Sequence, residues 1–156
     1  MSDVSKLQEL KDDYNRVLYA FIGKCDELEA QKRWDVEQDG QMEAYFQNVL
    51  YCIVLRIASA DGEFTKEERK YLHEIFDTPE DEDSVRDLFI ECGDSVDEMF
   101  NTQIDDSIKK LEGKDPETAD IFKNLIYLIC EIVIASDDNL IAAEKELVER
   151  IKRYLD

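Results

Sequence analysis

Glycine and proline are scarce in this chain, with five glycines and two prolines among 156 residues. Because these residues punctuate turns, their scarcity favours long helices and argues against a turn-rich β sandwich. The chain also lacks a CxxC pair, a glycine-rich phosphate loop and a nucleophile elbow, and its single histidine is His73. Catalytic metals keep an open position and often a histidine ligand, so we expect a protein that is not an enzyme.

Positive charge is outnumbered by negative charge. The 19 Lys and Arg stand against 39 Asp and Glu, which gives a net charge of −20. Such a field repels a phosphate backbone, so we expect no direct nucleic-acid binding. Cations and a basic protein partner fit the charge instead, and solubility alone is the alternative explanation.

Targeting signals are also absent from the sequence pattern. The first 15 residues show neither a basic leader nor an apolar signal core. The longest apolar runs contain Arg56 or Glu131 and stop short of a transmembrane segment. Cys52 and Cys130 lie inside such runs, where a buried free thiol is the usual state. These features predict a cytoplasmic protein.

Helical periodicity runs through the chain. From Ser5 onwards, apolar residues recur every three or four positions, which predicts a long amphipathic first helix. Residues 42–60 are apolar nearly all round and predict a central buried helix. The polar stretch before it, 35–41, has Gly40 as its turn signal, and we expect Trp34, just before that stretch, to be a cap over the core rather than a binding residue. Similar patterns predict later helices, one of them beginning at Pro116, and none shows sustained strand alternation. We therefore predict an all-α fold of about seven helices in a single bundle-like domain.

An internal repeat organises the chain. A shift of 76 residues aligns 46–75 with 122–151 and gives seven identical residues in thirty positions. We interpret this as two helix–turn–helix copies related by a pseudo-twofold axis. The predicted layout of the single domain, 1–156, is an N-terminal helix and connector (1–41), a first copy (42–78), linking helices (79–114) and a second copy (115–156).

Each copy carries an Asp and a Glu seven residues apart, Asp61 with Glu68 and Asp137 with Glu144. Ca²⁺ takes about six to eight oxygen ligands, and carboxylates supply them. If the two turns face one another, the four carboxylates come near a common point. A standard EF-hand is excluded, because its first two ligand positions would be Ile57 and Ser59.

Helix capping is the competing interpretation. Thr65 and Glu68 have the spacing of a capping box, in which the Glu side chain returns to the backbone of the Thr. In the second copy Ile141 replaces Thr65 and cannot cap through its side chain, yet Glu144 is present. Both interpretations stay open on these residues.

The segments IASADGEFTKEERKYLHEIF and VIASDDNLIAAEKELVERIKRYL resemble the two halves of the tellurite-resistance TerB family. The resemblance covers roughly Phe46 to the C-terminus. It implies an all-helical fold with internal pseudo-twofold symmetry, an acidic metal-binding centre and a role in bacterial stress response. Transferred by position, the metal-site residues would be Asp61, Glu68, Asp137 and Glu144, with Glu63 and Asp138 as auxiliaries. The second copy departs from the family pattern at Asp138-Asn139.

Two functions follow from these observations as expectations. The first is a non-enzymatic module in which a divalent cation, Ca²⁺ in preference, ties the two copies together and alters the surface offered to a protein partner. The second is a metal-independent acidic interaction protein that engages a basic partner or mimics nucleic acid.

Overall fold

The computed structural model describes residues 4–60, 66–78, 81–92, 96–136 and 142–156, and every regular element among them is helical. The elements are α1 (Val4–Ala30), α2 (Val36–Asp39), α3 (Met42–Ala58), α4 (Lys66–Phe76), α5 (Glu82–Cys92), α6 (Val96–Glu98), the π-helical η1 (Met99–Asp105), α7 (Asp106–Glu112), α8 (Pro116–Ser136) and α9 (Ala142–Leu155). The predicted all-α fold is confirmed. None of the described helices is both long and apolar enough to cross a membrane.

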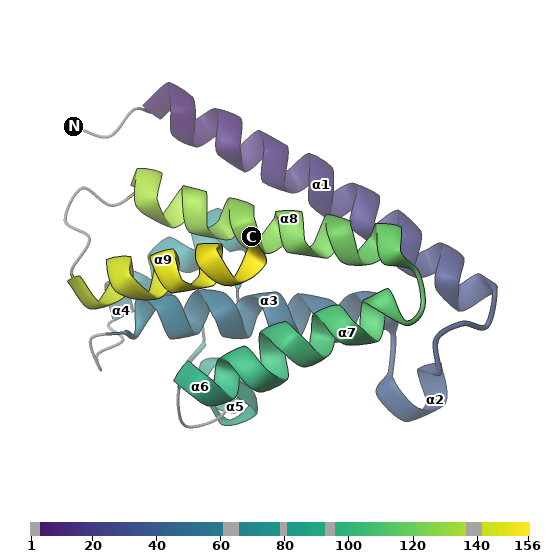
Figure 1. Cartoon of the computed structure of the whole chain (residues 1–156). Helices are drawn as coiled ribbons and strands as arrows, with labels where there is room; N and C mark the ends of the chain where they lie inside the picture. Colours follow the sequence, from purple (N-terminus) through teal and green to yellow (C-terminus); the bar gives the residue numbers. More distant parts are fainter. Residues whose placement is uncertain (1–3, 61–65, 79–80, 93–95, 137–141) are drawn as a thin grey trace.

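The two most apolar helices, α3 and α8, run in the same direction through the bundle (Figure 1). The long α1 packs along α8 in the opposite direction, while α7 and α9 also run against α3 and α8. The carboxyl ends of α3 and α8 therefore lie at the same end of the molecule, at the left of Figure 1.

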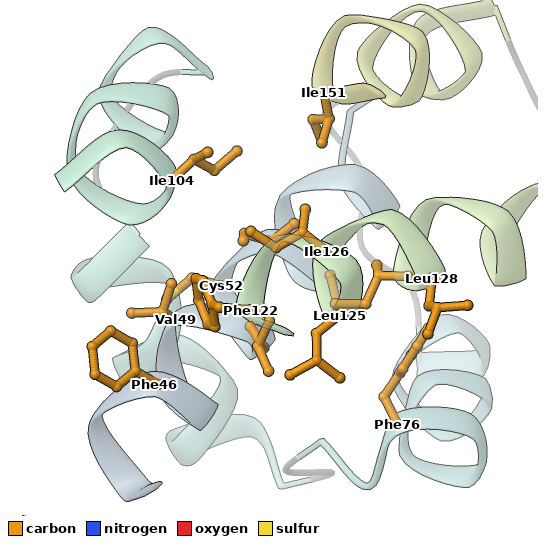
Figure 2. Close-up of a cluster of buried hydrophobic side chains, with 14 of the residues drawn as sticks. Phe46, Val49, Cys52, Phe76, Ile104, Phe122, Leu125, Ile126, Leu128 and Ile151 are labelled. Carbon is orange, nitrogen blue, oxygen red and sulfur yellow. The ribbon is translucent and has the colours of Figure 1, made fainter. Parts of the chain in front are cut away.

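The core is centred on three phenylalanines from three helices. Phe21 of α1, Phe46 of α3 and Phe122 of α8 are fully buried, with ring centroids 5.4–5.8 Å apart. Offset and edge-to-face rings at such distances attract one another beyond their burial of apolar area. Figure 2 shows part of the surrounding apolar cluster, to which α3, α8, η1, α4 and α9 all contribute.

The connector between α1 and α3 differs from the predicted turn because it contains the single helical turn α2. Asp35 begins it, since its Oδ1 accepts a hydrogen bond from Gln38 N at 3.2 Å. Gly40 then adopts φ 76° and ψ −167°, a conformation essentially restricted to glycine. Trp34 is buried beside this turn, as predicted, and its Nε1 donates to Gly40 O at 2.9 Å.

Helix α6, η1 and α7 form one continuous helical segment, whose middle part, η1, is π-helical. Phe100, Ile104 and Ile108 are buried and lie four residues apart. On an α-helix of 3.6 residues per turn, each such step rotates the side chain by about 40° away from the previous one. The turns of η1 are wider than those of an α-helix, which counteracts this drift, and Thr102 Oγ1 donates to Glu98 O at 2.8 Å.

At two pairs of equivalent positions, the two repeat copies have similar environments. Phe46 and Phe122 are both buried and touch, with ring centroids 5.4 Å apart, while Asn48 and Asn124 are both exposed. The twofold relation of the copies stays a prediction. The thiols of Cys25, Cys52 and Cys130 are free and buried, as predicted for the last two.

Candidate functional site

The predicted metal-site residues belong to the two connections that follow α3 and α8. Asp61, Glu63, Asp137 and Asp138 lie outside the described residues. Glu68 is the third residue of α4, although its side chain is also outside the described set. Glu144 is the third residue of α9 and is partly exposed. The two glutamates thus occupy the same position in the first turn of their helices.

Four helix ends gather where these connections begin and end. Figure 1 places the carboxyl ends of α3 and α8 and the amino ends of α4 and α9 at one end of the bundle. Helix α3 closes with a tightened turn, in which Ser59 N donates to Leu55 O at 3.0 Å and Ala60 N donates to Ile57 O at 3.2 Å. Asp61 follows this turn directly, and Asp137 directly follows Ser136 at the end of α8.

The charge of this end is set by the side chains. Helix carboxyl ends attract cations and helix amino ends attract anions, so two ends of each kind nearly cancel. Residues 61–68 contain four acidic side chains and one lysine, whereas residues 137–144 contain three acidic side chains and no basic one. The surplus is negative, and the first-turn position of Glu144 is favourable for a carboxylate.

Within the described part of the chain, no three His, Cys, Asp or Glu side chains form a group that could hold a metal ion. His73 is partly buried, and its Nδ1 lies 2.7 Å from Thr78 O. Its ring therefore packs where α4 ends. Any ion at this end therefore depends on the carboxylates of the two connections.

Helix α9 links this end to the π-helical segment, a link that the sequence did not reveal. Arg150 binds Asp97 at 2.8 Å and lies over the ring of Phe100, 4.4 Å from its centroid. The Tyr154 hydroxyl donates to Asp105, and burial, with this hydrogen bond, raises the pKa of Tyr154 to about 12. Hydrogen bonds from Lys109 and Tyr154 lower the pKa of Asp105. Contacts between segments this far apart leave no pattern in a single sequence.

Helix α9 is also anchored to α8. Lys152 forms an ion pair with Glu131 and lies 5.0 Å from the ring centroid of Tyr127. The hydrogen bond and charge of Glu131 raise the pKa of Lys152, which stays protonated at neutral pH. Helix α9 is thus held both by α8 and by the segment formed by α6 and η1.

The matching family model carries the description "Tellurite resistance protein TerB" and covers residues 47–156. The chain belongs to the TerB family. The matched part begins in the first turns of α3, includes both Asp–Glu pairs and leaves α1 and α2 before it. The resemblance found in the sequence is thereby confirmed at the level of the family. No curated protein and no solved structure matches the chain.

Proposed function

We propose that this TerB domain is a non-enzymatic module that binds a divalent cation between its two helix–turn–helix copies. The gathering of the four helix ends at one end of the bundle carries the proposal (Figure 1). Both acidic connections start and finish there, so the Asp–Glu pairs, 76 residues apart in the sequence, belong to connections that begin and end in the same region.

The donor set fits a hard cation. Asp61, Glu68, Asp137 and Glu144 offer carboxylate oxygens alone, with Glu63 and Asp138 as further donors. Ca²⁺ and Mg²⁺ prefer such ligands, and the flexible coordination of Ca²⁺ accepts more of them. An ion also relieves the mutual repulsion of the carboxylates, which capping alone does not. In the second copy Ile141 offers no side-chain cap, so a cation better accounts for Glu144.

The output of the site is a change in the surface offered to a protein partner, in bacterial stress response. Helix α9 carries Glu144 in its first turn and Arg150 and Tyr154 in its second half. An ion bound by Glu144 stabilises α9, and with it the contacts of these two side chains with Asp97 and Asp105. The net charge of −20 favours a basic partner.

Thermal unfolding with Ca²⁺, Mg²⁺, Mn²⁺ or Zn²⁺ against chelator tests the proposal. An ion at a hundredfold its dissociation constant adds about 2.7 kcal/mol to the free energy of unfolding. For a domain of this size, that is a rise in Tm of roughly 5–10 °C. The double variant Asp61→Asn, Asp137→Asn should lose the rise, and so should Glu144→Gln.

The matched control is Glu146→Gln, which removes one exposed carboxylate two residues further along α9 and should keep the rise. No rise with any of the four ions would refute cation binding. If Glu144→Gln and Glu146→Gln reduce the metal-dependent rise in Tm equally, the rise reflects the net charge of the protein and not a specific site. In that case the second function, that of a metal-independent acidic interaction protein, would replace cation binding. The net charge of −20 also supports that function.

A further inference from the structure

A groove of about 510 Å³ lies between the start of α3 and the π-helical segment. Its apolar floor is formed by the buried side chains of Val49 and Cys52. Its rim is polar, with Asp39 and Asn48 on the α2–α3 side and Thr102 and Asp106 on the η1–α7 side. A hollow with an apolar floor and a few polar groups at its rim is the usual form of a binding site.

The groove arises from local features of both walls. Ala44, Asn48 and Cys52 lie four residues apart and form one stripe of α3. Ala44 and Asn48 are exposed, although α3 is otherwise largely buried, and the small Ala44 leaves the stripe open. The opposite wall is η1, and π-helical turns are rare and occur frequently at functional sites.

The charge of the groove selects its occupant. Asp39 and Asp106 place carboxylates on opposite walls, and the described lining residues include no Lys, Arg or His. Asp39 is paired with Lys110, which lies outside the lining, so the charge that an incoming cation meets is chiefly that of Asp106. A Lys or Arg side chain combines an apolar stem, which suits the floor, with a cationic head, which suits the rim. A second copy of this chain is disfavoured, because each copy carries a charge of −20.

The chain itself shows this chemistry beside the groove. The Lys110 ammonium lies 5.0 Å from the ring centroid of Trp34 and 4.9 Å from that of Tyr45. It also binds Asp39 Oδ2 at 3.3 Å. Tyr45 and Asp39 both contribute to the groove lining, so two of the lining residues already bind a lysine of the chain itself.

We propose that the groove between α3 and η1 receives a Lys or Arg side chain from a basic segment of a protein partner. The inference rests on the interaction role proposed above and names the surface that this role uses. The site is separate from the acidic connections, because Asn48 lies about 15 Å along the α3 axis from Ala58, at 1.5 Å per residue.

NMR titration of the full chain tests the proposal. The first peptide is acetyl-Gly-Ser-Lys-Ser-Gly-amide, and the second has norleucine in place of lysine, which keeps the apolar stem and removes the charge. The lysine peptide should shift the amide signals of Asn48, Thr102 and Asp106, and the norleucine peptide should bind at least about threefold more weakly, as for loss of one exposed ion pair.

Two variants and one control locate the binding. Asp106→Asn should weaken binding of the lysine peptide about threefold to fivefold, the upper part of the range expected for an exposed ion pair. Ala44→Phe fills the groove from an exposed position and should abolish the localised shifts. Asp120→Asn removes an equal charge at an exposed position of α8 and should change the affinity less than twofold. Thermal unfolding of each variant verifies that it is folded.

The proposal is overturned if the shifts spread over the acidic surface, or if Asp106→Asn and Asp120→Asn weaken binding equally. Equal binding of the norleucine and lysine peptides also overturns the proposal. So does a titration in which spermidine saturates the groove signals while the lysine peptide shifts none of them, because the groove would then be a site for a free amine. These outcomes are distinct from failure of the proposed cation site, which is read from Tm with and without metal ions.

Discussion

Replacing glycine by alanine at two positions should change stability in opposite directions. At Gly40, φ is 76° and an added Cβ would meet no heavy atom within 4 Å. The penalty is therefore confined to the backbone, at about 1–3 kcal/mol for a residue forced into such a region. At Gly23, inside α1, a Cβ also meets nothing within 4 Å, and no positive φ is present. Alanine there should stabilise the helix by about 0.5–1 kcal/mol.

Urea unfolding followed by circular dichroism measures both changes. The two variants should differ by about 1.5–4 kcal/mol in free energy of unfolding, with equal m values, although the chemical substitution is the same. Gly113→Ala is the control, because its φ is −68° and the nearest atom to an added Cβ is Lys109 O at 3.6 Å. It should be neutral or stabilise the protein by up to about 1 kcal/mol, as at other positions whose conformation alanine can adopt.

A neutral or stabilising Gly40→Ala would refute the conformation assigned to the α2–α3 connector. A destabilising Gly23→Ala would refute the open surroundings of that position in α1. Since Gly40 O accepts the indole hydrogen bond of Trp34, the fluorescence of this single tryptophan gives an independent view of the connector.

Two further predictions concern buried titratable groups. Burial raises the pKa of the Cys25 and Cys130 thiols to about 12, so both should react with an aromatic disulfide reagent only as fast as the chain opens; rapid reaction in native buffer would contradict their burial. Burial also raises the pKa of Tyr14 above its ordinary value of 10.0. The folded state then holds this proton more tightly than the unfolded state, and stability falls as pH rises above 10. Tyr14→Phe should reduce that fall in a series of urea unfolding curves, and an unchanged slope would show that Tyr14 is accessible.

The sequence predicted a helix correctly where the apolar periodicity and the capping residues indicate the same boundaries. Pro116 is the first residue of α8, as expected, and Asp115 precedes it with its carboxylate bound by Thr118 Oγ1 at 2.7 Å. That hydrogen bond lowers the pKa of Asp115, as it favours the charged form. The apolar pattern of residues 42–60 likewise predicted the buried α3. Such signals are local, so one sequence is enough to read them.

Two local features were not predictable. Helix α2 is a single turn of four residues, too short to show periodicity. The π-helical form of η1 depends on packing, because the same spacing of Phe100, Ile104 and Ile108 is also compatible with an α-helix whose apolar stripe drifts.

The amino-acid sequence by itself determined the helical class, the negative charge and the paired Asp and Glu residues, because composition and spacing are properties of the chain alone. Tertiary structure decided where those features meet. Packing of α3 and α8 in the same direction brings both acidic connections to one end, and α9 joins that end to η1 through Arg150 and Tyr154. The groove beside Asn48 likewise exists only because two distant helices form its walls. Such proximity comes from the burial of apolar faces against one another, which fixes relative positions that no local pattern encodes.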